Sequence, residues 1–198
     1  MEQLLNLLAS IYPLSERLET HLRGIIKLAV YKKGAVILPA GEVCNHIFFI
    51  ETGLVRSFYA VDGKEVSNWF MKEGDICISV LSFLRRIPSF ETHIALEACR
   101  CWGITYLELE EVYRLQPEFN IHGRIITGEY YCRSEERQID IKLRAPTETY
   151  KKLMEKDPGL ILRVQNNDLA SFLGVRPRTL DNMKRAFKEI KRPGQRPG

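Results

Sequence analysis

The chain has 198 residues, of which 45% are hydrophobic and 27% charged. This composition is typical of a globular protein with a sizeable core, and it excludes a fibrous repeat or a disordered chain. The uncharged stretch near the start, residues 3–15, is short and contains Pro13. We therefore expect neither a signal peptide nor a membrane span, and we expect a cytoplasmic protein.

The formal net charge is +4, but it is unevenly distributed. Residues 1–141 carry a net charge of −4 and residues 142–198 a net charge of +8. A basic terminal region on an acidic body favours a polyanionic partner, with nucleic acid as the first candidate.

The five cysteines are an odd and scattered set without a CxxC pair: Cys44, Cys77, Cys99, Cys101 and Cys132. This pattern indicates reduced thiols and excludes a disulfide framework. Cys99 and Cys101 would share one strand face, but the sequence offers no spaced Cys or His pair to complete a tetrahedral metal site. We expect buried thiols and no metal.

In chain order, the first segment predicts two short helices. Leu4, Leu5 and Leu8 are followed by Leu14, Leu18, Leu22 and Ile25 at helical spacing, and Ser15 is a suitable N-cap.

From about Val30 to Leu109, glycines separate short β-rich runs, which predicts an antiparallel sandwich or barrel. Asp62-Gly63 indicates a type I′ hairpin. The runs cover residues 35–39, 46–51, 54–61, 66–71, 75–80, 93–98 and 101–109. A short helix and loop, SVLSFLRRIPSFETH, interrupt them.

Helical spacing returns with a short helix after Glu110 that stops at Pro117, followed by a long helix. One narrow stripe runs along the long helix: Ile121, Ile125, Gly128, Cys132 and Ile139. Small residues in such a stripe permit close helix approach, so we expect the helix to pair with its own copy. The alternative is that the stripe only packs on the β domain.

Ala145-Pro146-Thr147 is the expected domain boundary. We expect Pro146 to break the helical pattern and Thr147 to cap a new helix through Met154, which ends at Asp157-Pro158-Gly159. The final KRPGQRPG is too rich in Pro and Gly to predict ordered structure.

The stretch NDLASFLGVRPRTLDNMKRAF predicts two helices joined by a tight turn. Asn166 or Asn167 can cap the first helix, Gly174 can end it in a left-handed conformation, and Pro177 can begin the second. The apolar and small positions of a helix-turn-helix are all filled, by Leu169, Ala170, Leu173, Gly174, Val175, Leu180 and Met183.

The other face of the second helix combines guanidinium, amide and hydroxyl groups that contact phosphates and base edges in a major groove. We predict that DNA is bound by Arg176, Arg178, Thr179, Asn182, Arg185 and Lys188. The alternative is a solvated basic face that binds nothing.

The order of these parts resembles the cyclic AMP receptor protein and fumarate-nitrate reductase regulator (Crp/Fnr) family of bacterial transcription factors. PAGEVCNHIFFIETGLVRSF resembles the entry to the family β-roll, KEGDI the turn before its phosphate-binding cassette, and APTETYKKLMEKDPGL the link to its DNA-binding domain.

The resemblance implies an α+β protein with three parts: a β-roll effector domain with N-terminal helices over residues 1–116, a dimerisation helix over 117–144 and a helix-turn-helix domain over 145–198. It implies a homodimer through residues 118–142, with the recognition helices near 177–190 in successive major grooves. RNA polymerase is a further candidate partner.

The chain departs from the cyclic-nucleotide binders of this family. Their Gly-Glu pair corresponds to Ile78-Ser79 and their Arg with Ser or Thr to Thr92-His93, so the guanidinium that pairs with the phosphate is missing. Arg85 and Arg86 lie on the intervening helix segment, where we expect a solvated role. We infer that cyclic AMP is not bound in the usual way and predict no cofactor. An unidentified effector would lie near Ser79, Ser82, Phe83, Thr92 and His93.

Other departures concern the cofactor and the operator. No cysteine precedes Cys44, so we expect no iron–sulfur cluster, while a haem site stays open on four scattered histidines: His21, His46, His93 and His122. Asn182, preceded by Asp181, stands where relatives commonly carry Arg, which favours adenine over guanine. The β-hairpin wing of many relatives is missing.

The sequence leaves two alternative functions. One is a β-roll binding module whose helical end serves a protein partner. The other is a cupin-like metalloenzyme, which the lack of a His-x-His pair opposes. Without a recognisable catalytic motif, we predict no enzyme.

Overall fold

The computed structural model describes the backbone of residues 1–190 and the side chains of residues 1–187. Two helices, α1 (Glu2–Ile11) and α2 (Glu16–Ile25), open the chain as the leucine spacing predicts. The Ser15 hydroxyl accepts a hydrogen bond from the Leu18 amide at 3.2 Å, which confirms the predicted cap. Within the described residues no helix combines the length and apolar character needed to cross a bilayer.

Over residues 1–190, eight antiparallel strands form two four-stranded sheets, β1-β8-β3-β6 and β2-β7-β4-β5, which confirms the predicted β-roll. The strands are β1 (Lys27–Tyr31), β2 (Val36–Leu38), β3 (His46–Thr52), β4 (Val55–Val61), β5 (Lys64–Met71), β6 (Ile76–Cys77), β7 (Thr92–Ala95) and β8 (Cys99–Thr105). Alternate residues from both sheets form a buried core that includes Phe48, Ile50, Val55, Met71, Cys99 and Cys101.

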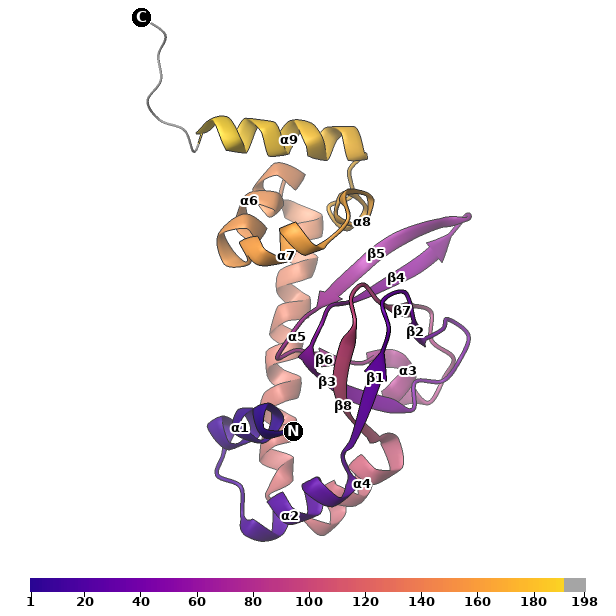
Figure 1. The fold of residues 1–198 in the computed structure, drawn as a ribbon, viewed down its shortest axis with the longest axis vertical. Helices are drawn as coiled ribbons and strands as arrows, with labels where there is room; N and C mark the ends of the chain where they lie inside the picture. Colours follow the sequence, from indigo (N-terminus) through magenta and orange to yellow (C-terminus); the bar gives the residue numbers. More distant parts are fainter. Residues whose placement is uncertain (191–198) are drawn as a thin grey trace, which may run out of the picture.

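The β4–β5 hairpin turns at Asp62-Gly63, where both residues have positive φ, 51° and 73°. These are the values that a type I′ turn requires, so the hairpin prediction is confirmed. In the ribbon the tip of the hairpin projects beyond the rest of the roll, on the side away from α5 (Figure 1).

The predicted strands are wrong at both ends of the roll. They omit strand β1, which pairs with β8, and they extend the last strand to Leu109. The strand ends at Thr105, whose hydroxyl accepts from the Glu108 amide at 3.2 Å while the Glu108 carboxylate accepts from the Thr105 amide at 2.9 Å. This capping box begins α4 (Tyr106–Leu115) despite the β propensity of the residues that follow.

The predicted interruption of the strands is present as α3 (Val80–Arg85), and the predicted long helix as α5 (Phe119–Leu143), which runs alongside the roll (Figure 1). It packs on the roll through Tyr130, whose hydroxyl accepts from the Ile76 amide at 2.6 Å, and through Arg133, which pairs with Asp75 at 2.9 Å.

The apolar stripe of α5 lies on another face of the helix. Ile125, Gly128, Cys132 and Ile139 are exposed, and Ile121 is partly buried. The alternative that this stripe packs on the β domain is therefore wrong for four of its five residues.

In the described part of the chain, four helices follow α5: α6 (Pro146–Lys156), α7 (Pro158–Arg163), α8 (Asn166–Phe172) and α9 (Pro177–Ile190). The expectation that Thr147 caps α6 is wrong, because Pro146 occupies the first helical turn and Ala145 precedes it as the N-cap. Proline needs no hydrogen-bond acceptor there. Helix α7 was not predicted; the Asp157 carboxylate caps it by accepting from the Leu160 amide at 3.0 Å.

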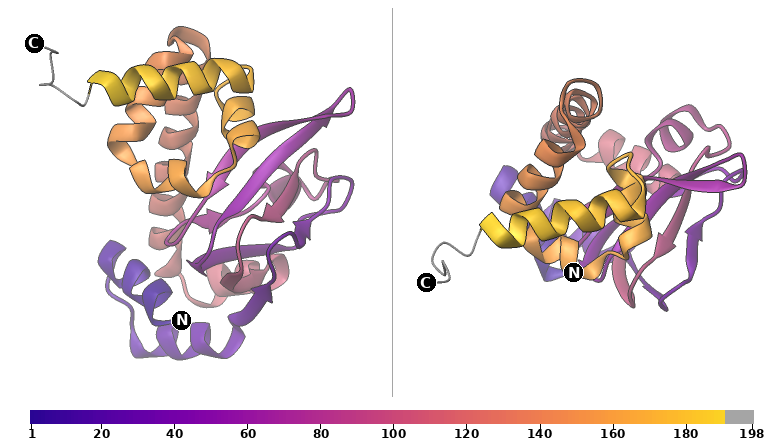
Figure 2. Two further views of the ribbon diagram at one scale, coloured as in Figure 1. Left: turned by 45° about the horizontal axis from the view of Figure 1, so that its top comes forward. Right: turned by 90° about the horizontal axis from the view of Figure 1, so that it is seen from above.

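The C-terminal helices share one apolar cluster with the roll. Leu54 and Phe70 pack with Leu160, Leu169 and Leu173, all buried. Helix α9 lies across the end of the molecule farthest from α1 and α2 (Figures 1 and 2). The shared cluster therefore fixes where α9 is presented.

Candidate functional site

The turn between α8 and α9 is built as the sequence indicates. Gly174 has φ 69°, and the Val175 amide donates to the Ala170 carbonyl at 3.0 Å, which closes the end of α8. Pro177 then begins α9. The predicted cap at Asn166 or Asn167 is wrong, because Gln165 is the N-cap and no side chain caps α8.

Asn166 instead connects the two helices. Its amide group donates to Asp181 at 3.1 Å, and its oxygen accepts from Lys184 at 2.7 Å. Underneath, Leu180 and Met183 are buried against α8. Polar and apolar contacts together fix α9 across α8.

The opposite face of α9 is exposed. The residues predicted to contact DNA that the structure describes all lie on the surface: Arg176, Arg178, Thr179, Asn182 and Arg185. The Lys188 side chain lies outside the described residues. Within the described part of the chain, Arg176 and Arg178 make no side-chain hydrogen bond or ion pair. Their guanidinium groups are therefore free to contact an external anion.

Asn182 and Arg185 lie one turn apart on this face and contact each other, with the Arg185 guanidinium donating to Asn182 Oδ1 at 2.5 Å. Among the described side chains, the amide nitrogen of Asn182 donates to no partner. Asp181, tied to Asn166, is turned towards α8. The Asp181 carboxylate is thus hydrogen-bonded to an uncharged partner on α8.

Of the residues predicted around the effector pocket, His93 lines the cavity inside the roll, and Ser79, Ser82, Phe83 and Thr92 do not. His93, 2% exposed, lines a cavity of about 220 Å³ inside the roll together with Leu38, Glu42, Cys44, His46, Phe48 and Cys77. Phe83 belongs to the core and packs on Tyr106, and Thr92 accepts from the Ala40 amide at 3.1 Å.

The two predicted serines are engaged within the protein. Ser82 accepts from the Cys44 amide at 2.8 Å and donates to the Ile87 carbonyl at 2.6 Å, and Ser79 contacts the Ser89 hydroxyl at 3.1 Å. They hold the loop around α3 in place, and neither lines the cavity inside the roll.

Glu91 is a residue of this region that the sequence reading missed. Its side chain is mostly buried, accepts from the Asn68 amide at 3.0 Å and lies 3.4 Å from His93 Nε2. Burial raises the pKa of the Glu91 carboxyl, but contacts with His93, Asn68 and Ser79 outweigh it, so the pKa is lower than usual. A carboxylate therefore stands next to the position expected for the phosphate-binding residues.

The expectation that Arg86 is solvated is wrong. Its guanidinium donates to the Cys44 carbonyl at 2.8 Å and to the Phe83 carbonyl at 3.1 Å, and it stacks on the Tyr106 ring at 4.2 Å. Arg86 therefore joins α3 to the loop before β3. Arg85 is exposed.

The four histidines stand on separate elements, α2, β3, β7 and α5. His122 is buried with Nε2 3.0 Å from the Tyr12 carbonyl, and His46 stacks on Phe48. Burial raises the pKa of Cys77 and raises that of Cys101 to about 12, so both thiols are protonated at neutral pH. In the described chain, no three His, Cys, Asp or Glu side chains are grouped to hold a metal ion.

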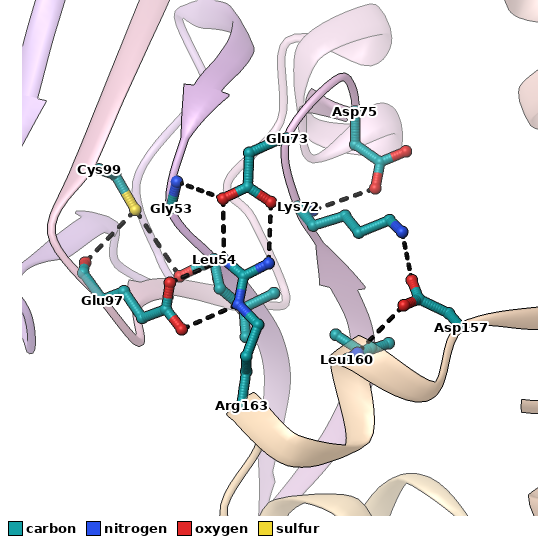
Figure 3. Close-up of polar contacts among 10 residues, drawn as sticks. All are labelled: Gly53, Leu54, Lys72, Glu73, Asp75, Glu97, Cys99, Asp157, Leu160 and Arg163. Atoms are coloured by element: carbon teal, nitrogen blue, oxygen red, sulfur yellow. Dashed lines mark hydrogen bonds and ion pairs between the residues drawn. The ribbon is translucent and has the colours of Figure 1, made fainter. Parts of the chain in front are cut away.

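An ion-pair network joins the C-terminal helices to the roll (Figure 3). The Arg163 guanidinium donates to both oxygens of Glu73, each at 2.8 Å, and to both oxygens of Glu97 at 2.9 and 2.7 Å. Lys72 pairs with Asp157 beside it. The Arg163 contacts lower the pKa of Glu73 to about 2.

A second set of contacts joins α8 to the β4–β5 hairpin. The Ser171 hydroxyl accepts from the Ser67 amide and donates to the Glu65 carbonyl, both at 3.0 Å. The buried Arg56 lies between Glu65 at 2.6 Å and Asp168 at 3.1 Å. The helix-turn-helix is therefore docked on the roll along the hairpin and at its base.

Comparison with known proteins agrees with this architecture. Residues 28–115 match the cyclic nucleotide-binding domain model. FixK2 from Bradyrhizobium japonicum has a TM-score of 0.72 at 18% identity, over 88% of this chain and 90% of that chain. No curated protein sequence is significantly similar to the chain.

Two further solved structures are similar over most of their length. A Crp/Fnr-family transcriptional regulator from Eubacterium rectale has a TM-score of 0.68 at 16% identity, over 91% of this chain and 88% of that chain. The Thermus thermophilus catabolite activator protein has a TM-score of 0.56 at 16% identity, over 93% and 90%. At these identities the likeness shows a common fold.

Proposed function

We propose that the protein is a dimeric, sequence-specific DNA-binding regulator, because residues 28–115 match the cyclic nucleotide-binding domain and about nine tenths of the chain share the fold of Crp/Fnr transcription regulators. The observation that carries the proposal is the exposed face of α9. There Arg178, Asn182 and Arg185 lie together in the basic part of the chain.

The chemistry of this face suits a major groove. Arg176 and Arg178 stand at the start of α9, where the helix dipole also favours phosphate. Asn182 and Arg185 lie one turn further along, where side chains reach base edges. We assign Arg176 to the DNA backbone and the pair of Asn182 and Arg185 to the bases. Arg178 lies between them and can reach either the backbone or a base.

The exposed stripe of α5 supports a dimer. Ile125 and Ile139 are 38% and 45% exposed, and Gly128 between them has nothing within 4 Å of an added Cβ. Apolar side chains on either side of a small residue suit close packing against the same stripe of a second copy. A two-fold axis along α5 would place both α9 helices at one end, as a palindromic operator requires.

The interior of the roll argues against a cyclic phosphate as the signal. The Glu91 carboxylate would face the phosphate across a poorly solvated space, and like charges repel strongly there. We propose an effector other than a cyclic nucleotide, in contact with His93 in the roll cavity. Contact with RNA polymerase stays a prediction, and we propose no catalytic activity.

Selection of bound fragments from random double-stranded DNA, with purified full-length protein, tests the function. We expect an enriched inverted repeat whose half-sites are about one helical turn apart. Failure to enrich any sequence, together with the absence of salt-dependent non-specific binding, would contradict the proposal and favour a module acting on a protein partner.

A further inference from the structure

A second cavity lies where the roll, α5 and the C-terminal helices meet. Its volume is about 270 Å³, and it is separate from the cavity inside the roll and from the exposed face of α9. Strand β5 contributes Trp69 and Phe70 to the wall, the turn after β5 contributes Lys72, helix α5 contributes Arg137, and helix α8 contributes Phe172. We call this space the junction cavity.

The acidic side chains of the junction cavity are already matched with cations. Arg133 pairs with Asp75 at 2.9 Å, Lys152 with Asp140 at 3.1 Å, and Lys72 with Asp157. Glu136, the fourth carboxylate, lies 3.9 Å from both Lys152 and Lys156. Each carboxylate in the wall therefore has a positive partner within 4 Å.

Arg137 is the basic residue of the wall that remains without a carboxylate. Among the described residues its hydrogen-bond partner is the Phe172 carbonyl, to which Nη2 donates at 2.6 Å, and its guanidinium stacks on the Phe172 ring at 3.7 Å. Its Nε is buried and has no acceptor. Burial lowers the Arg137 pKa, with only partial compensation from the Asp140 charge.

A buried guanidinium N–H without an acceptor is rare in folded proteins, because it forgoes both water and a hydrogen bond. An anion in the junction cavity would supply the missing acceptor, and carboxylate and phosphate groups match the guanidinium fork. The wall also contains apolar and aromatic side chains, Trp69, Phe70, Leu153, Leu160 and Phe172, of which Phe172 stacks on Arg137 itself.

We propose that the junction cavity is a binding site for a small organic anion, whose carboxylate or phosphate pairs with Arg137 and whose planar apolar body lies against Trp69 and Phe70. The site does not depend on the proposed DNA binding. Since its wall comes from β5, α5, α6 and α8, occupancy would also couple the roll to the helix-turn-helix.

Benzoate and inorganic phosphate are suitable probes, because they share a compact anion and only benzoate has a ring. Trp69 reports on the site by fluorescence in a full-length Trp102→Phe protein, where it is the remaining tryptophan. We expect benzoate to quench Trp69 saturably at concentrations up to about 10 mM, and phosphate to bind about tenfold more weakly or not at all.

Arg137→Gln should weaken benzoate binding at least about tenfold. Arg124→Gln, an exposed arginine on the same helix, is the matched control and should bind as the parent does. Leu153→Phe, which narrows the cavity without changing its charge, provides a second test if Arg137→Gln does not fold.

Loss of binding in Arg137→Gln or Leu153→Phe, with Arg124→Gln unaffected, would support the site. No saturable quenching, or equal quenching in all variants, would overturn the proposed site. Phosphate binding as tight as that of benzoate would overturn the proposed contact of a planar apolar body with Trp69 and Phe70. These readouts involve no DNA, so a failure here leaves the proposed function standing, and the converse also holds.

Discussion

Arg163 of α7 and Glu73 of the turn after β5 form a two-pronged ion pair, with both N–O distances at 2.8 Å. Because Glu97 accepts from the same guanidinium, one arginine holds two carboxylates of the roll. This geometry stabilises the docked position of the C-terminal helices more than a single surface ion pair would.

Replacing Arg163 with Ala should loosen that docking. The variant loses four charge-assisted hydrogen bonds and leaves Glu73 and Glu97 facing each other. Since all three groups are partly exposed, we expect a loss of about 1–2 kcal/mol in the free energy of unfolding, or about 2–8 °C in Tm. Thermal unfolding followed by circular dichroism measures this.

Arg114→Ala is the matched control, because Arg114 forms an exposed pair with Glu111 on α4. Its Tm should stay within about 1 °C of the parent. Equal losses in both variants would mean that the Arg163 network contributes no more than an ordinary surface pair.

The same network predicts an acid-sensitive stability. The pKa of Glu73 falls from 4.5 to about 2 on folding, mainly through Arg163, so ionised Glu73 favours the folded state. This contribution is complete above pH 4.5, declines as the unfolded chain takes up the proton, and is lost near pH 2.

Urea unfolding between pH 6 and 3 tests this dependence. We expect Glu73→Gln to have a shallower decline in stability with falling pH than the parent. Glu51→Gln is the comparison variant, because the pKa of the Glu51 carboxyl is also lowered to about 2 but by contacts that do not involve Arg163. A Glu73→Gln curve parallel to that of the parent would refute the role of Glu73.

Arg178→Ala should weaken binding to the selected operator by about 1–3 kcal/mol. If Arg178 contacts only a phosphate, the loss will be the same for all DNA sequences and the salt slope will fall by about one. Fluorescence anisotropy at several salt concentrations separates the two cases. Arg85→Ala, an exposed arginine of the roll, should leave affinity unchanged.

Asn182→Arg should change the preferred base. The Asn182 side chain suits adenine through its amide, whereas arginine suits the two acceptors of guanine, so selection should shift one position of each half-site from A to G. The contact between Arg185 and Asn182 also predicts that Arg185→Ala alters preference at that position. An unchanged selected sequence would place Asn182 outside the reading contacts.

Ile139→Glu should dissociate the proposed dimer, because a charge on the α5 stripe would be buried at the interface. Sedimentation velocity should give the monomer mass for this variant and the dimer mass for the parent. Ser134→Glu, on an exposed part of α5 away from the stripe, is the control. A dimer that persists in Ile139→Glu would mean that the copies meet through another surface.

The sequence predicted α8, α9 and the hairpin at Asp62 well, because each rests on turn residues close together in the chain. It failed where distant residues decide. The environment of Glu91 depends on Asn68 in β5, and Arg86 donates to the Cys44 carbonyl in the loop before β3. The errors at Thr105 and Pro146 have local causes. The capping box at Thr105 begins a helix despite the β propensity of the following residues, and Pro146 is accepted in the first turn of a helix, where proline does not break it.

The apolar cluster shared by the roll and the C-terminal helices has a consequence for how the chain unfolds. Removing residues 145–198 would remove the apolar side chains that cover Leu54 and Phe70 and would leave an exposed hydrophobic patch on the roll. The isolated C-terminal fragment would in turn expose Leu169 and Leu173. The roll and the C-terminal helices should therefore unfold in a single cooperative transition, and each part should be prone to aggregate when it is produced alone.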